Sequence, residues 1–219
     1  VGDPKELDKK IAALNNKQMA AKILLNSAYG ALGNQYFRYF DIRQAESITL
    51  SGQLAIRWIE KKVNEYVNKI LQNEQEKNYV IASDTDSIYV TLGDLVHKVF
   101  NQGTAFKESD DIIQTERVVN FLDRVAQEKI EPFIDRSYQE LALYMNSYEQ
   151  KMFMKREVIA SKGLWTAKKR YILNVHDSEG VRYKEPDLKI MGIEAVRSST
   201  PAACRDKLKQ SFKVIMGEI

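Results

Sequence analysis

The spacing of apolar residues along the chain predicts three long helical regions. Positions 5–31 are rich in Ala, Leu, Lys and Gln, and Gly30 and Gly33 favour an end to this first helix. From about 43 to 71, apolar and small residues recur at steps of three and four. These positions are Ile48, Gly52, Ala55, Ile59, Val63, Tyr66 and Ile70. The opposite face of this helix, which includes Lys62 and Asn64, is expected to lie in water. A third helical region covers about 111–146, in which Pro132 predicts a kink or a break.

Short runs of β-favouring residues predict strands that are linked as hairpins. They are expected as a hairpin at 78–92, strands near 151–160 and 165–176, a turn at 177–180 and a short strand at 181–184. A last helix should begin at 201, because Thr200 can cap it and Pro201 suits its first position. Blocks of helices around hairpin-linked strands predict an α+β fold with a mostly antiparallel sheet.

Composition narrows the class of protein only a little. A chain of 219 residues with 44% hydrophobic content can bury a substantial core. No apolar run approaches the roughly 20 residues that span a bilayer, so we expect no membrane partner. The single cysteine, Cys204, excludes a disulfide within the chain and fits a cytoplasmic location.

Positive charge is concentrated in one stretch of the sequence. Positions 151–170 hold seven basic side chains and one acid, Glu157, whereas the whole chain has a net charge of only +3. Aromatic residues are interleaved with these basic residues, as is typical of a surface that binds a phosphate backbone. A solvated strand face is the alternative interpretation of the same pattern.

Two carboxylates are expected at the tip of the first hairpin. Asp84-Thr85-Asp86-Ser87 separates the runs Tyr79-Val80-Ile81-Ala82 and Ile88-Tyr89-Val90-Thr91. Residues i and i+2 of an extended segment point the same way, so Asp84 and Asp86 could present their charges to one divalent cation such as Mg²⁺. A solvated polar turn is the simpler interpretation of an isolated Asp-X-Asp, although the alternating flanks favour a half-buried hairpin.

One face of the first helix combines three chemically different side chains. Lys22, Asn26 and Tyr29 fall at i, i+4 and i+7, so an ammonium, an amide and a phenol ring share that face. An ammonium can neutralise a phosphate, and a ring can stack on a base. Without further context, a surface lysine, a capping asparagine and a core tyrosine would explain the same residues.

Taken in order, these motifs resemble those of a known family. The run Lys22-Ile-Leu-Leu-Asn26-Ser27-Ala-Tyr29-Gly30 resembles the fingers-helix motif of family B DNA polymerases, and Asp84-Thr85-Asp86-Ser87 resembles their palm hairpin. Lys168-Lys169-Arg170-Tyr171 resembles the segment that grips the primer-template duplex. The stretches 33–41 and 189–192 are most similar to replicative polymerases of large tailed phages. The resemblance implies the second half of the fingers at 1–32, the palm at 33–193 and the start of the thumb at 194–219.

The resemblance also implies roles for individual residues. The helix would bind the incoming deoxynucleoside triphosphate through Lys22 and Asn26, with Tyr29 and Gly30 forming the surface under the nascent base pair. Asp86 and Asp84 would be catalytic Mg²⁺ ligands in a two-metal nucleotidyl transfer, and Glu157 would lie near the metals. The DNA grip would consist of Lys168, Lys169, Arg170 and Tyr171. Expected partners are primer-template DNA, the nucleotide, an amino-terminal polymerase portion and a sliding clamp, in the host cytoplasm if the gene belongs to a phage.

Two departures from the family pattern change what we expect of this chain. Ala82-Ser83 stand where the family usually has Tyr-Gly, which affects the fine placement of the hairpin. The family's upstream Ser-Leu-Tyr-Pro-Ser-like run, with its catalytic aspartate, does not occur here. We therefore expect an excised portion or a split subunit of a polymerase that does not polymerise DNA alone. A non-catalytic module that binds duplex DNA is the alternative, and an Asp-X-Asp nucleotide-sugar transferase is a third and weaker one.

Overall fold

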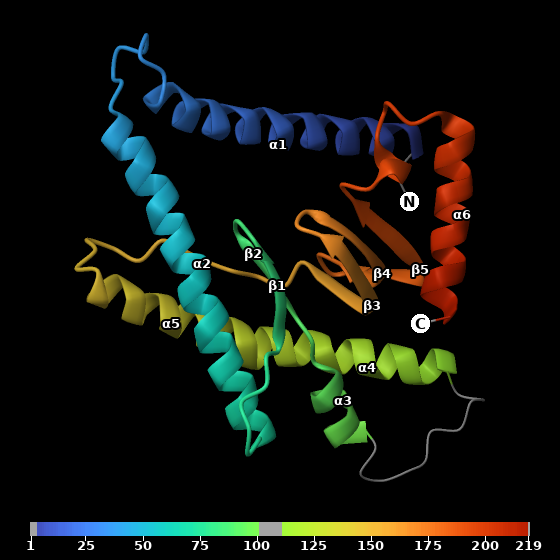
Figure 1. Ribbon diagram of the computed structural model, residues 1–219. Coiled ribbons are helices and arrows are strands. Elements are labelled where there is room, and N and C mark those ends of the chain that lie inside the picture. The colour runs from blue at the N-terminus through green and yellow to red at the C-terminus, as the bar shows by residue number, and fades with distance from the viewer. Residues whose placement is uncertain (1–3, 101–110, 219) are drawn as a thin grey trace. The chain divides into compact units, whose positions relative to one another are not determined.

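The computed structural model describes residues 4–100 and 111–218 (Figure 1). The chain divides into two compact units, the first ending at residue 54. The first unit contains helix α1 (Pro4–Leu32) and the beginning of helix α2 (Ile42–Leu71). None of the described residues of α1 is buried. Gly30 lies inside the last turn of α1, and the chain leaves the helix at Gly33, close to the predicted end.

The second unit combines helices with two antiparallel sheets, which confirms the predicted α+β class. Its elements are the rest of α2, β1 (Val80–Asp84), β2 (Ser87–Val90), α3 (Gly93–Phe100), α4 (Asp111–Val125), a π-helical segment (Ala126–Ile130), α5 (Glu131–Tyr144), β3 (Val158–Ala167), β4 (Arg170–Ser178), β5 (Val181–Met191), a 3₁₀ turn (Glu194–Val196) and α6 (Ala202–Glu218). Strands β1 and β2 form a two-stranded sheet, and β3, β4 and β5 form a three-stranded one in that order. No described helix is long and apolar enough to cross a bilayer.

Three elements differ from the prediction. The chain from 151 to 157 is not a strand, and β3 and β4 meet instead at a two-residue turn formed by Lys168 and Lys169. Strand β5 extends to Met191 rather than ending at 184, because an edge strand can contain a residue such as Pro186 that lacks an N–H group. Helix α3 was not predicted at all.

The helical run from α4 to α5 is continuous through the position where Pro132 predicted a kink or a break. Proline cannot donate an i→i−4 hydrogen bond, and its ring crowds the preceding turn. The wider turns of the π-helical segment Ala126–Ile130 directly precede it and accommodate the change in spacing, so Pro132 occupies the first turn of α5.

The main core lies between α2, β1 and α5. Buried side chains recur along α2 every four residues from Ala55 to Leu71, and they pack against Tyr79 and Val80 on one side and α5 on the other. The apolar stripe of α2 was therefore predicted correctly at Ala55, Ile59 and Val63, whereas Ile48 and Ile70 are exposed.

Strand β4 has apolar residues on both faces of the larger sheet, as expected for a central strand. Tyr171, Leu173 and Val175 pack on the face that meets Tyr89 of β2. On the other face, Ile172 packs with Met216 of α6, which lies alongside the sheet in Figure 1. Because successive side chains alternate between faces, the sheet joins the β1–β2 hairpin on one side to α6 on the other.

Candidate functional site

The two aspartates lie at a tight turn between β1 and β2. Asp84 is the last residue of β1 and pairs with Ser87, so Thr85 and Asp86 form the turn. Thr85 adopts a left-handed conformation with φ of 50°, and the Asp86 N–H donates to the Asp84 carbonyl at 2.6 Å. The alternation of an extended strand therefore does not continue through Thr85, which corrects the geometric premise of the prediction. Asp84 is partly buried and Asp86 is exposed.

Asparagine side chains on α2 hold the beginning of β1. Asn64 Oδ1 accepts hydrogen bonds from the N–H groups of Tyr79 and Val80, both at 2.8 Å. Asn68 likewise accepts from the Lys77 N–H at 3.0 Å and donates to the Lys77 carbonyl at 2.7 Å. The predicted solvent-facing role of Asn64 was therefore wrong, because its amide replaces a partner strand for the approach to the hairpin.

Serine at position 83 is compatible with the hairpin. Ser83 pairs with Ile88 across the two strands, and its hydroxyl lies 3.4 Å from Glu60 Oε2 of α2. The replacement of the family's usual glycine thus leaves the pairing intact beside the aspartates.

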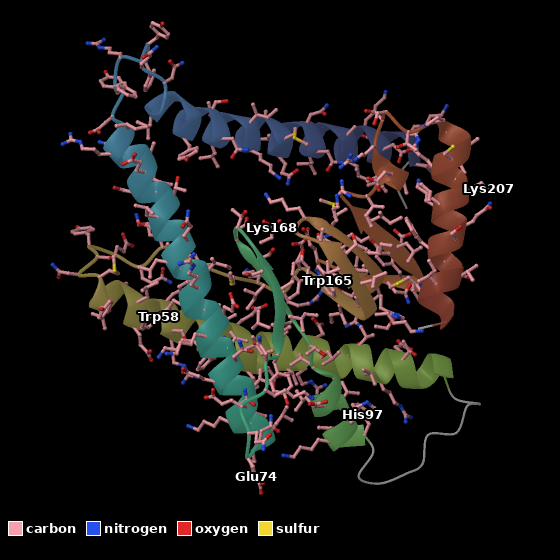
Figure 2. The ribbon with its side chains drawn as sticks, viewed as in Figure 1. Trp58, Glu74, His97, Trp165, Lys168 and Lys207 are labelled. Carbon is pink, nitrogen blue, oxygen red and sulfur yellow. The ribbon has the colours of Figure 1, made fainter. Side chains whose placement is uncertain are left out.

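The basic segment forms the turn between β3 and β4, and its four residues have different surroundings. Lys168 is exposed at the turn (Figure 2), while Lys169 has φ of 62° and places Nζ 3.6 Å from Asp84 Oδ1. Arg170 lies 3.4 Å from Glu194 Oε1. Tyr171 is only 7% exposed, so its ring packs inside the protein. The structure thus brings the acidic hairpin and the basic turn together.

Gly192, which directly follows β5, allows the chain to pass close to this turn. It has φ of 67°, and a Cβ at this position would lie 2.1 Å from the Lys169 carbonyl oxygen. No residue with a side chain fits here unless the turn moves. The position of Lys169 therefore depends on the glycine that follows β5.

An aromatic cluster joins the two hairpins. The Tyr89 ring of β2 lies 5.4 Å from that of Trp165 and 5.3 Å from that of Tyr171. Burial raises the pKa of Tyr171, and a hydrogen bond with Tyr89 and the negative charges of Glu157 and Asp84 raise it further. The Tyr171 hydroxyl therefore stays protonated and lies within the field of two of the three predicted metal-site carboxylates, Glu157 and Asp84.

Glu157 is positioned immediately before β3. Its Oε1 accepts from Lys189 Nζ at 2.7 Å, and its carbonyl accepts from the Glu179 N–H at 2.6 Å. The side chain is 57% exposed and lines an open polar pocket of about 650 Å³ together with Lys155, Arg156 and Glu179. The carboxylate is thus tethered but accessible.

Several basic side chains of the stretch 151–170 form ion pairs with acidic residues of the protein. Arg156 is 12% exposed and contacts Asp123 and Asp177, and Lys151 pairs with Glu149 at 3.1 Å. Burial alone would raise the pKa of Asp123, but the hydrogen bond and charge of Arg156 outweigh it and hold that pKa below its usual range. The stretch is therefore not a uniform phosphate-binding face, and its exposed basic residues are Lys151, Lys155 and the turn at 168–169.

The predicted nucleotide-binding residues all lie on α1, in the first unit. Lys22, Asn26 and Gly30 are exposed, and the space beside Gly30 is open to 4 Å around the place of a Cβ. The Tyr29 hydroxyl forms a 2.8 Å hydrogen bond with Thr49 Oγ1 of α2, and Thr49 in turn donates to the Ala45 carbonyl. Tyr29 is thus fixed in direction while 45% of it remains exposed.

Comparison with known proteins identifies the family. The model of DNA polymerase family B matches residues 4–117, which is more than half of the chain. The chain belongs to DNA polymerase family B.

Two viral relatives match almost the whole of this family B chain. It is 48% identical over 209 residues to a protein of Escherichia phage RB69 named DNA-directed DNA polymerase, covering 92% of this chain and 22% of the relative. It is 44% identical over 221 residues to the protein of the same name from Enterobacteria phage T4, covering 97% and 24%. A DNA polymerase beta of African swine fever virus is 24% identical over 200 residues. The chain spans about a quarter or less of the length of these relatives.

The family B assignment agrees with the three motifs, but sequence reasoning missed residues that position them. Lys189 and Gly192 were noted in the sequence only because the stretch 189–192 resembles phage polymerases. In the structure, Lys189 contacts Glu157 and Gly192 lies against Lys169. Gly192 itself was the available signal, because glycine readily adopts the left-handed conformation that other residues avoid. Among residues 4–100 and 111–218, no group of three His, Cys, Asp or Glu side chains is arranged to hold a metal ion.

Proposed function

We propose that this chain forms the carboxyl-terminal part of a template-directed DNA polymerase active site. It would contribute a nucleotide-binding helix, an acidic hairpin and a grip on primer-template DNA. The observation that carries the proposal is the meeting of hairpin and basic turn, with Lys169 Nζ 3.6 Å from Asp84 and Tyr89 packed against Tyr171. The fingers, palm and thumb boundaries at 1–32, 33–193 and 194–219 belong to the same proposal.

The residues at the hairpin tip fit a hard divalent cation. Asp86 is exposed and Asp84 partly so, and carboxylate oxygens are the ligands that Mg²⁺ prefers. We propose that Asp86 and Asp84 hold Mg²⁺ together with an aspartate from the upstream palm motif, with Glu157 nearby. Bound Mg²⁺ would supply the positive charge that phosphoryl transfer requires.

The chain's own residues would bind and orient the substrates. The Lys22 ammonium would pair with the triphosphate, and Asn26 would hydrogen-bond to the triphosphate and the sugar. Tyr29, held by Thr49, would present its ring and the open surface of Gly30 to the nascent base pair. These contacts would hold the nucleotide at a fixed distance from the primer end, which is a large part of catalysis by proximity.

The turn at 168–169 would grip the duplex without reading its sequence. Lys168 and Lys169 are exposed cations on a turn fixed by the sheet, and contacts of this kind add salt-dependent affinity. Tyr171 is buried, so we propose that it supports the turn rather than touching DNA directly. The remaining partners are the rest of the polymerase and a sliding clamp, in the host cytoplasm.

Primer extension by the assembled polymerase tests this function. We use that term for this chain joined to, or mixed with, the polypeptide that carries the upstream palm motif. We expect Asp86→Ala to abolish extension, and Asp135→Ala, which removes an exposed carboxylate on α5, to leave it unchanged. Extension that survives Asp86→Ala would show that the hairpin is not the metal site.

A second candidate function is duplex binding without catalysis, which the intact basic turn favours. In that case the isolated chain should bind primer-template DNA, with an affinity that falls as salt rises and falls again in Lys169→Ala. Absence of duplex binding at low salt would eliminate this alternative, since phosphate contacts are strongest there.

A further inference from the structure

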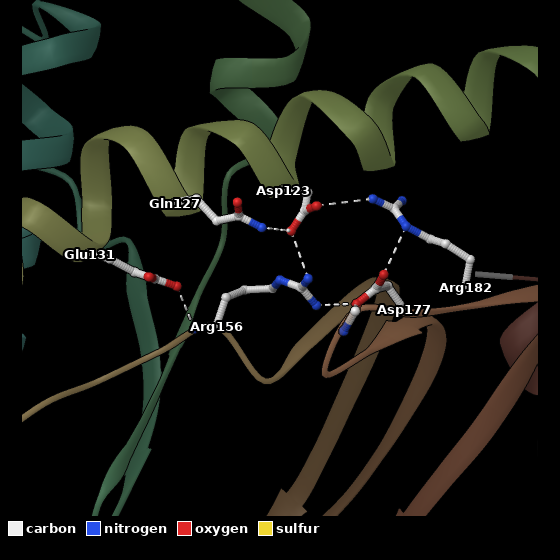
Figure 3. A network of polar contacts seen from close by, with 7 residues as sticks. Asp123, Gln127, Glu131, Arg156, Asp177 and Arg182 are labelled. Atoms are coloured by element: carbon white, nitrogen blue, oxygen red, sulfur yellow. Dashed lines mark hydrogen bonds and ion pairs between the residues drawn. The ribbon is translucent and has the colours of Figure 1, made fainter.

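A compact network of charges surrounds Arg156, just before β3 (Figure 3). Its guanidinium donates to Asp177 at the end of β4 and, at 2.6 Å, to Asp123 Oδ1 of α4. Arg182 of β5 contacts the same two carboxylates from the other side, at 2.8 Å and 3.3 Å. Two guanidinium groups thus balance two carboxylates, of which Asp177 is fully buried.

The backbone of Arg156 is tied as firmly as its side chain. Its N–H donates to Glu131 Oε1 at the start of α5, at 2.9 Å. Asp177 Oδ1 also accepts from the Gly180 N–H at 3.0 Å, which closes the turn between β4 and β5. In that turn, the Glu179 N–H donates to the carbonyl of Glu157. The network therefore joins the α4–α5 run, the β4–β5 turn and the segment that enters β3.

This arrangement has a consequence for Glu157, the neighbour of Arg156. Residues 149–157 form no regular strand, and the Glu157 carbonyl is held by the Glu179 N–H at the point where the segment enters β3. Arg156 reaches toward α4 and Asp177, while Glu157 reaches toward Lys189 of β5. The contacts that fix Arg156 therefore also restrict the direction of the neighbouring Glu157 side chain.

We propose that Arg156 is a positioning residue that holds Glu157 in place beside the acidic hairpin. This inference rests on the proposed function, in which Glu157 lies near the metals. The planar guanidinium is suited to the task because it reaches two carboxylates at once, which a lysine ammonium cannot do with the same fixed geometry. Lys189 holds the Glu157 side chain from the opposite side.

The first test needs no metal and no substrate. Amide hydrogen exchange of the full chain would be measured for the Glu179 N–H, which is bonded to the Glu157 carbonyl. We expect faster exchange in Arg156→Lys and unchanged exchange in Glu157→Gln, because glutamine keeps the carbonyl. Unchanged exchange in a folded Arg156→Lys would overturn the proposal. Asp177→Asn is a second variant that should act in the same direction.

The second test is a double-mutant cycle in the assembled polymerase, read as the Mg²⁺ concentration that gives half the maximal extension rate. We expect Arg156→Lys and Glu157→Gln each to raise it by about 10- to 100-fold, as outer-shell partners of metals do. The double variant should match Glu157→Gln alone, since Arg156 acts through Glu157. Fully multiplicative effects would overturn the inference. Absence of extension in the assembled polymerase without substitutions would instead refute the proposed function. Hydrogen exchange would still decide the role of Arg156.

Discussion

Replacing Gly192 with alanine should displace the basic turn and destabilise the second unit. The residue has φ of 67°, and its Cβ would lie 2.1 Å from the Lys169 carbonyl oxygen and 3.2 Å from Arg170 Cγ. A normal carbon–oxygen contact is about 3.3 Å or longer. Either the Lys169 turn or strand β5 must move by about 1 Å or more.

The expected cost has two parts. A left-handed conformation costs an alanine about 1–2 kcal/mol. Steric overpacking typically adds about 1–3 kcal/mol. Added together, the two costs should lower the free energy of unfolding of Gly192→Ala by about 2–5 kcal/mol.

Gly180 provides a matched control in the adjacent turn. It also has positive φ, 87°, but no atom lies within 4 Å of its Cβ position. Gly180→Ala should cost only the backbone part, about 1–2 kcal/mol. Denaturant unfolding of the full chain, with similar slopes for all three proteins, gives the comparison. If Gly192→Ala is no less stable than Gly180→Ala, the close approach to Lys169 does not exist.

Two further predictions concern other parts of the second unit. Burial lowers the pKa of His176, so the folded protein favours the neutral ring, and its contribution to stability is present above the unfolded value of about 6.5 and lost as pH falls. Urea midpoints between about pH 7.5 and 5 should therefore decline more in the parent than in His176→Asn, and equal declines would contradict the reasoning. Asn64→Leu leaves two backbone N–H groups without acceptors and should cost about 1–3 kcal/mol or more, whereas Asn64→Asp keeps the acceptor and should cost less. Equal losses of unfolding free energy in the two variants would show that Asn64 does not support β1.

Local patterns sufficed for features that depend on neighbouring residues. The Asp84–Ser87 turn between two alternating runs, the α2 stripe at Ala55, Ile59 and Val63, and the helix that ends by Gly33 all follow from short-range spacing. What the pattern could not contain is the choice of tertiary partner. Asn64 and Arg156 both occur in polar stretches that predicted solvent exposure or DNA contact, yet one supports a strand and the other is buried in a charge network.

In the candidate site, too, local patterns predicted the motifs but not their tertiary partners. The three motifs carried the predicted residues, because each motif is contiguous in sequence. The pairing of Lys169 with Asp84 and of Lys189 with Glu157 depends on how the β1–β2 hairpin and strands β3 to β5 pack, which no single segment encodes. Tyr171 was predicted to contact DNA, but the rings of Tyr89 and Trp165, which come from other segments, pack beside it.

A change of metal preference at Asp86 tests the central claim most directly. In the assembled polymerase, Asp86→Cys should lose extension with Mg²⁺ by more than the about 10- to 100-fold typical of outer-shell partners. A thiolate binds softer ions, so part of the rate should return with Mn²⁺ or Cd²⁺. Asp135→Cys should behave like the parent with every metal. Recovery specific to Asp86→Cys would show that this hairpin residue is a metal ligand in nucleotidyl transfer. Full activity of the folded variant with Mg²⁺, or an equal loss with every metal, would contradict it.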